Sequence, residues 1–409
     1  MKNTKFIGRY WFYLEYYTYI KTTKSEAIIL NTIDNSYILS KDERIIFLIE
    51  KIEETKMQGG LMIDFENDYK DKIYHSFFNK IRNKYMGDII SDKLFNNPPF
   101  QFQYKPFINN TYSTNRNQDY LNNLVFSINI HVTNLCTSNC KLCNKYYKQF
   151  YSCTKYLEGD YISEKSLENI FSNSYTNLNN INILGGNLSL YTNIDLLFKY
   201  LEGYNNICHA YFNIENINSI TPQIISFFKE KIHLIIDFSK ISTYSLDKIH
   251  KHLKSFIIDF IITDENSYNL AIECISLYKI ERFTINPLFH NNISFFKKYI
   301  YINRKDILNK PQSIKKIHNN HLINPFYFGH LNVSPNGDVY GRIGERCLGN
   351  VNNKTITQIV YSILDQTDIS WFNTRESTSC SSCVFTDICP PISNYEYEIG
   401  KFNLCSIKK

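Results

Sequence analysis

The sequence lacks the long apolar runs and the one-sided charge that would assign it to a membrane or to a nucleic acid. No stretch approaches the ~20 uncharged apolar residues of a membrane span. Glu15 interrupts the aromatic N-terminal segment, so no signal peptide is recognisable. The net charge of +6 on 409 residues is too small to indicate nucleic-acid binding. We therefore expect a cytoplasmic protein.

The chain also lacks an internal repeat and the composition of a disordered protein. Hydrophobic residues make up 43% and charged residues 21%, which are proportions of a globular protein. We expect an α+β unit over 1–95 and a polar linker over 96–123. In the first unit, residues 8–20 indicate a strand and 26–39 a hairpin, and Ser40 with Glu43 forms a capping-box pattern that predicts a helix start.

Residues 124–305 alternate between strand and helix patterns. This alternation predicts a parallel sheet whose ligands bind at the carboxyl ends of the strands. Six such units would make a partial (β/α)6 TIM-like barrel, which is the fold class we expect, followed by a cysteine-rich extension over 306–409. The expected strands cover residues 125–133, 181–185, 209–215, 232–238, 256–263 and 282–289.

Three cysteines, Cys136, Cys140 and Cys143, follow the first of these strands directly. In a reducing compartment, clustered cysteines usually bind metal or perform chemistry, and thiolates at this density suit zinc or an iron–sulfur cluster. A closed zinc site needs four ligands, and the next cysteine, Cys153, is ten residues further on. Three thiolates on a four-iron cluster would leave one iron open. The alternative is a zinc knuckle or an incidental group of cysteines.

The C-x3-C-x2-C spacing at this position resembles the signature of the radical S-adenosylmethionine (SAM) superfamily, with Leu142 in place of the usual aromatic residue. The resemblance implies a SAM-binding [4Fe–4S] cluster on the three cysteines. After the second strand, Gly185-Gly186-Asn187 is similar to the glycine-glycine-glutamate motif that holds the SAM amino group, although an uncharged amide weakens that contact. An ordinary glycine turn is the alternative.

Asp237, at the end of the fourth strand, is a further candidate for contact with the SAM ribose or the substrate. A solvated loop aspartate is the alternative reading of this residue.

The C-terminal segment contains Cys380, Cys383 and Cys389 in a C-x2-C-x5-C pattern, followed by Cys405. With the upstream SPNGDVYG and LGNV segments, it resembles the SPASM extension of peptide-modifying radical SAM enzymes. That pattern has seven cysteines for two auxiliary clusters. Here Arg342 and Ser393 stand at two of the missing cysteine positions, so we expect one auxiliary [4Fe–4S] cluster. Cys347 is out of register, and a four-cysteine zinc site is the alternative.

The N-terminal unit resembles, in its hairpin and capped helix, elements that bind a leader peptide by strand addition; an inert cap is the alternative. Its YWFYLEYYTYI and ILNTIDNSYIL segments are similar to the pseudo-radical-SAM subfamily of the Bacteroidales double-glycine peptide system. The resemblances imply an enzyme that modifies a ribosomally made precursor peptide by reductive SAM cleavage and hydrogen abstraction. They also imply an external one-electron reductant as the source of electrons. The alternatives are a catalytically inactive partner of a companion maturase, and a zinc-bound structural protein.

Overall fold

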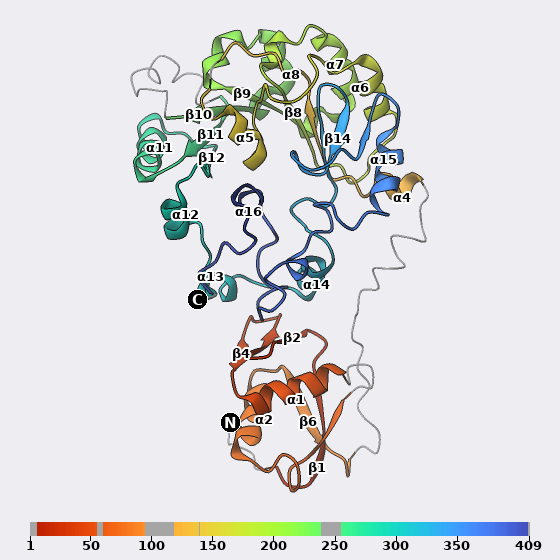
Figure 1. Cartoon of the computed structure of the whole chain (residues 1–409), viewed down its shortest axis with the longest axis vertical. Helices are drawn as coiled ribbons and strands as arrows, with labels where there is room; N and C mark the ends of the chain where they lie inside the picture. Colours follow the sequence, from red (N-terminus) through yellow and green to blue (C-terminus); the bar gives the residue numbers. More distant parts are fainter. Residues whose placement is uncertain (1–5, 55–59, 95–117, 139, 239–254, 408–409) are drawn as a thin grey trace.

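The structure, a computed structural model of the chain, describes residues 6–54, 60–94, 118–138, 140–238 and 255–407. It contains one nine-stranded sheet and two three-stranded sheets. Figure 1 shows the N-terminal part, in red and orange, at one end of the elongated molecule and the large sheet with its helices at the other. Within the described ranges, no helix combines the length and the apolar character needed to cross a membrane.

All six strands expected between residues 124 and 305 are present, and each pairs in parallel with the next along the chain. The large sheet has the order β12-β11-β10-β9-β8-β7-β13-β14-β15. The mixed α/β class with a mostly parallel sheet is therefore confirmed, whereas closure into a partial barrel stays a prediction. The six strands are β7 (Ser127–His131), β8 (Asn180–Leu184), β9 (Cys208–Asn213), β10 (Ile232–Asp237), β11 (Ile257–Ile262) and β12 (Phe283–Pro287).

Helices cover one face of this sheet, because alternate strand residues such as Ile128, Ile130 and Ile183 are apolar and pack against buried helix residues. In Figure 1, α6, α7 and α8 lie side by side outside the strands. Burial of these side chains supplies the main core of the molecule. The helices of this region are α4 (Gln118–Asn122), α5 (Cys143–Gln149), α6 (Glu164–Phe171), α7 (Ile194–Leu201), α8 (Pro222–Phe228), α11 (Glu265–Tyr278) and α12 (Ile293–Tyr299).

The C-terminal segment adds strands to the same sheet. A hairpin turns around residues 335–337, and its first strand pairs in parallel with β7. A helix follows Thr355, whose side chain accepts a hydrogen bond from the Gln358 backbone N–H. The elements of this segment are α13 (Arg304–Leu308), α14 (Ile314–Leu322), β13 (His330–Val333), β14 (Asp338–Tyr340), β15 (Gly349–Asn350), α15 (Ile356–Ile363) and α16 (Asn394–Ile399).

Two expectations for the N-terminal unit were wrong in detail. The single strand expected over 8–20 is two strands in different sheets, because a turn at Glu15, whose C=O accepts from the Thr18 N–H at 2.9 Å, reverses the chain. The helix cap is Asp42, which accepts from the Arg44 N–H, and not Ser40. The unit contains β1 (Arg9–Leu14), β2 (Thr18–Thr22), β3 (Ala27–Asn31), β4 (Tyr37–Ser40), α1 (Glu43–Glu54), β5 (Leu61–Asp64), α2 (Lys72–Asn83) and β6 (Gly87–Ser91).

The N-terminal unit packs against the C-terminal segment through strand β2. The Tyr19 hydroxyl donates to the Asp387 carboxylate at 2.9 Å, and the Lys21 ammonium pairs with Glu376. Apolar side chains of both segments form a shared core beside these contacts. The divisions at 95, 123 and 305 stay predictions, and most of the expected linker lies outside the described residues.

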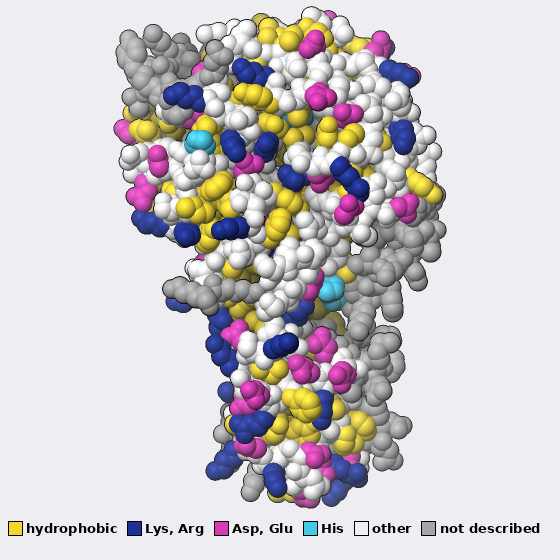
Figure 2. Space-filling view, in the orientation of Figure 1, with side chains coloured by type: hydrophobic (Ala, Val, Ile, Leu, Met, Phe, Trp, Pro, Cys, Tyr) yellow, Lys and Arg dark blue, Asp and Glu magenta, His cyan; other side chains and the backbone are white. Residues whose placement is uncertain are grey.

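The surface carries both signs of charge side by side. Figure 2 shows lysine and arginine side chains interspersed with aspartate and glutamate over the visible face, in both the narrow N-terminal end and the larger part. This mixture agrees with the modest net charge of +6.

Candidate functional site

The first cysteine group lies on a loop that leaves the carboxyl end of β7. The loop runs along Gly185 and Gly186, which follow β8, and two backbone hydrogen bonds hold it there. The Gly186 N–H donates to the Thr133 C=O and the Asn187 N–H donates to the Leu135 C=O, each at 2.7 Å. The end of β8 therefore fixes the backbone immediately before Cys136.

Both glycines are required by this close approach. A Cβ on Gly186 would lie 2.2 Å from the Leu135 carbonyl oxygen, and a Cβ on Gly185 would lie 2.8 Å from the Thr133 carbonyl oxygen. We expected these glycines to admit a ligand to the backbone. The structure instead shows the chain's own cysteine loop against them, so their first role is to position that loop.

The three thiols differ in exposure. Cys136 and Cys140 are half-buried and Cys143, the first residue of α5, is buried. Burial raises the pKa of the Cys143 thiol, and the Cys136 thiol nearby raises it further. Hydrogen bonds from the Lys155 backbone and the Thr154 side chain oppose this rise, because they stabilise the thiolate.

Cys153 lies beside this group, although it is ten residues further along the chain. It is buried, and its pKa is raised first by burial and then by the charges of Cys143, Cys140 and Cys136. The structure therefore brings a fourth cysteine close to the other three.

Asp237 is buried at the carboxyl end of β10 and faces α5. The Tyr146 hydroxyl donates a hydrogen bond to its carboxylate. Burial raises the pKa of Tyr146, and the charges of Asp237, Cys140 and Cys143 add to this effect, so the hydroxyl remains a donor near the thiols. The sequence suggested Asp237 but not Tyr146, which had only its position three residues after Cys143 as a signal.

Asn187 is buried and its side chain is already used within the protein. The amide oxygen accepts from the Ser189 N–H at 3.1 Å, and the amide nitrogen donates to the Ser219 hydroxyl at 3.2 Å. This side chain caps the short helix η1 (Leu188–Leu190). A contact from Asn187 to a SAM amino group would have to share the oxygen that holds this cap.

A second segment, after β9, reaches the cysteine loop. The Cys140 sulfur lies 3.9 Å from the Glu215 carboxylate, and the Ser138 hydroxyl donates to the Asn216 side chain at 3.0 Å. Asn213 ends β9 and accepts from the Glu215 N–H, which starts this turn. Sequence reasoning missed Glu215, because a carboxylate after a strand has no distinctive pattern.

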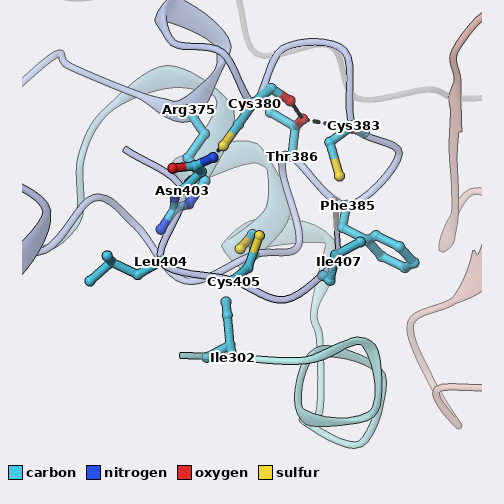
Figure 3. A pocket seen from close by; sticks show the side chains of 11 residues that line it. Ile302, Arg375, Cys380, Cys383, Phe385, Thr386, Asn403, Leu404, Cys405 and Ile407 are labelled. Carbon is cyan, nitrogen blue, oxygen red and sulfur yellow. Dashed lines mark hydrogen bonds between the residues drawn. The ribbon is translucent and has the colours of Figure 1, made fainter. Parts of the chain in front are cut away.

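The second cysteine group surrounds one cavity in the C-terminal segment. Figure 3 shows the Cys380, Cys383 and Cys405 side chains around it, and Cys389 also lines it. The structure thus brings together all four thiols that the sequence assigned to one auxiliary site. Cys347 does not line this cavity; it is exposed.

A buried arginine lies against this cavity. The Arg375 guanidinium pairs with both oxygens of Glu396 at 2.9 and 3.1 Å and lies 3.9 Å from the Cys380 sulfur. Burial raises the pKa of the Cys389 thiol to about 12, and the Arg375 charge opposes this rise. A fixed cation here would favour the thiolate form on which metal binding depends.

The face of the large sheet opposite the helices carries a hydrogen-bonded row of polar side chains. His233 lies 2.9 Å from the Asp259 carboxylate and 3.0 Å from His209. Burial lowers the pKa of His209 to about 4, so its ring is neutral at pH 7. The row makes this face hydrophilic, unlike the apolar interior typical of a parallel barrel. Its members are Asn332, Asn129, Asn182, Tyr211, His209, His233, Asp259, Thr284 and Asn286.

A larger cavity, of about 460 Å³, opens beside this row. Asn129, Asn286 and Asn332 belong to both the row and the cavity wall. The end of α5 and the start of α16 form other parts of the wall, so the cavity lies between the sheet and the C-terminal segment. Its size suits a side chain or a short stretch of peptide.

One close set of possible metal-ligand atoms lies outside both cysteine groups. Among the described residues, His321, Glu376 and Asp387 offer three such atoms within 4.8 Å of one another. Glu376 and Asp387 are already paired with the Lys21 ammonium.

No protein-family model matches the chain, and no curated protein has a matching sequence. Among solved structures, Streptococcus suis SuiB, crystallised with S-adenosylmethionine, aligns with 97% of this chain and 99% of its own, at 14% identity and a TM-score of 0.48. A histidine-tagged protein named anSMEcpe, with bound AdoMet, aligns with 65% of this chain and 84% of its own, at 14% identity and a TM-score of 0.39. These likenesses are too distant to assign a ligand, so function rests on the residues described above.

Proposed function

We propose that this chain is a radical SAM iron–sulfur protein that acts in the modification of a ribosomally made peptide. The observation that carries the proposal is the loop of Cys136, Cys140 and Cys143 at the carboxyl edge of a parallel sheet. Three ligands would hold a four-iron cluster with one open iron. When bound, that cluster and SAM supply reductive cleavage of SAM and hydrogen abstraction from the substrate.

The protein's own residues would hold and orient these groups. Gly185 and Gly186 fix the cysteine loop, while hydrogen bonds from Thr154 and Lys155 stabilise the Cys143 thiolate. Asp237, which accepts a hydrogen bond from Tyr146 of α5, would accept another from a ribose or substrate hydroxyl. The cavity of about 460 Å³ beside the polar row would take the substrate and exclude water.

The C-terminal cysteines would hold one auxiliary [4Fe–4S] cluster. Cys380, Cys383, Cys389 and Cys405 would occupy all its ligand positions, and Arg375 would offset the charge of the thiolates. An external one-electron reductant would supply electrons to both clusters. The N-terminal unit, which contacts this segment through Tyr19 and Lys21, would serve peptide recognition.

A second candidate function is that of an inactive pseudo-radical-SAM partner, which binds the precursor peptide or a companion maturase. Asn187 favours it. The amide oxygen that would meet the SAM amino group already caps η1, and it carries no charge. Weak SAM binding would leave the fold and clusters intact without catalysis.

Anaerobic reconstitution of the wild type and the Cys136→Ala/Cys140→Ala/Cys143→Ala variant distinguishes these functions. Iron and sulfide are counted, and 5′-deoxyadenosine is measured after addition of SAM and dithionite. We expect about eight iron atoms in the wild type, about four in the variant, and 5′-deoxyadenosine from the wild type alone. If the wild type holds the extra iron but forms no 5′-deoxyadenosine, the partner function is favoured. If both hold the same iron, the first site is not a cluster site.

A further inference from the structure

Two residues of the C-terminal segment, Arg342 and Ser393, line the wall of the larger cavity. Arg342 places a cation there, beside the polar row of the large sheet. A cation in the wall of a concave site attracts anionic ligands.

The Arg342 guanidinium has hydrogen-bonding capacity to spare. Its Nη1 donates to the Ile343 C=O at 2.9 Å, and the plane lies over the Tyr397 ring at 4.2 Å. Its Nε is buried and has no hydrogen-bond partner. Because the protein covers this Nε, a ligand in the cavity would meet the guanidinium through its other N–H groups.

The two charged residues that line this cavity, Arg342 and Lys148, are both cations, and the lining residues include no aspartate or glutamate. The Glu345 carboxylate lies behind the wall, beside the lining residue Gly341. Its oxygens accept from the backbone N–H groups of Arg342 and Ser370, and it forms no ion pair with the Arg342 guanidinium. Two cations on the surface of a concave site favour an anionic ligand.

We propose that this cavity binds a carboxylate of the peptide substrate, with Arg342 as its principal contact and Lys148 as a second cation. The assignment of the ligand as a substrate rests on the proposed function. Carboxylates are the anions that an unmodified peptide offers, and a planar guanidinium can bind one through two parallel hydrogen bonds. Tyr327, Tyr395 and Phe326 line the same cavity and would pack against the side chains beside that carboxylate.

The test is a ligand-observed NMR titration of the full chain, purified without oxygen, with three short peptides. Acetyl-Gly-Glu-Gly-amide offers a side-chain carboxylate, acetyl-Gly-Gln-Gly with a free C-terminus offers a main-chain one, and acetyl-Gly-Gln-Gly-amide offers none. We expect one of the two acidic peptides to bind roughly tenfold or more tightly than the neutral peptide. Which of them binds more tightly identifies the source of the carboxylate.

Variants assign the binding to this cavity. Arg342→Gln should abolish the preference for the acidic peptide, Arg342→Lys should retain part of it, and Lys148→Gln should reduce it. Lys165→Gln, which removes the same charge from the exposed start of α6, should change nothing. Far-UV circular dichroism confirms that each variant is folded.

Equal binding of the acidic and neutral peptides, no binding of any peptide up to millimolar concentration, or an unchanged preference in Arg342→Gln would each overturn the proposal. The titration requires neither SAM nor reductant. A wild type that forms 5′-deoxyadenosine but shows no preference would therefore refute the carboxylate site alone. A preference for the acidic peptide without SAM cleavage would refute the proposed enzymatic function and support the carboxylate site.

Discussion

Replacement of Arg375 by methionine should strongly destabilise the C-terminal segment. The guanidinium and the Glu396 carboxylate are 7% and 2% exposed, and they form two hydrogen bonds of 2.9 and 3.1 Å. The arginine also donates to the C=O of Pro390 at 2.5 Å and of Phe402 at 3.0 Å. Removal of one partner of a buried ion pair leaves an uncompensated charge, which typically costs about 3–5 kcal/mol.

The assay is equilibrium urea denaturation followed by tryptophan fluorescence, because the buried Trp371 lies in the affected segment. Arg375→Met should lower the free energy of unfolding by about 3–5 kcal/mol. In the double variant Arg375→Met/Glu396→Gln neither charge remains, so its loss should be smaller than the sum of the two single losses. Arg346→Met is the matched control, since the Arg346–Asp368 pair is 52% and 69% exposed, and it should cost less than about 1 kcal/mol.

Equal losses in the free energy of unfolding for Arg375→Met and Arg346→Met would refute this reasoning, because burial would then not determine how much an ion pair contributes to stability. Additive losses in the double variant would also contradict it. Iron bound by the C-terminal cysteines gives a second readout. Arg375→Met should lose most of it, since the variant lacks the cation that favours the Cys389 thiolate.

Three further predictions concern the first site and the sheet beside it. Gly186→Ala should lose the iron bound by the first cysteine group, because the new Cβ would lie 2.2 Å from the Leu135 carbonyl oxygen. The control Gly203→Ala, whose Cβ would have no atom within 4 Å, should retain all of that iron. Iron analysis of both variants checks this prediction. Cys153→Ala should keep the iron and any 5′-deoxyadenosine formation of the wild type, whereas a four-thiolate site would lose metal. Burial lowers the pKa of His131 to about 3, below the ~6.5 of the unfolded chain, so its contribution to stability is present above pH 6.5 and is lost as pH falls toward 3. At pH 5 this amounts to about 2 kcal/mol relative to pH 7.5, and urea denaturation of His131→Leu should show that much less acid sensitivity than the wild type.

The sequence predicted the six parallel strands because each has a short apolar run followed by turn residues, and because local chain order gives parallel pairing. It did not predict that β13 pairs with β7, since this contact joins residues about 200 apart and no local pattern encodes it. The turn at Glu15 was missed for a similar reason. Aromatic residues on both sides of it suit strands equally, and only pairing with β5, β6 and β3 decides where each strand ends.

The candidate site residues were predictable where their spacing in the sequence is distinctive. They were not predictable where their role depends on burial and on neighbours in the folded protein. The cysteine spacings identified two sets of thiols, and the structure brings the four C-terminal ones to one cavity. The contribution of Cys153, Glu215 and Arg375 depends on burial and on neighbours from other elements. Such features arise only after folding.

The two cysteine groups are linked by a continuous series of contacts. Cys143 begins α5, and the end of that helix contacts α16, where the Asn394 side chain donates to the Gln149 C=O at 3.0 Å. On the same helix, Glu396 pairs with Arg375, which lies against Cys380. The Lys145–Glu398 ion pair joins the same two helices. The two cysteine groups are therefore connected through α5 and α16, and the Arg375–Glu396 pair is one link in that series of contacts.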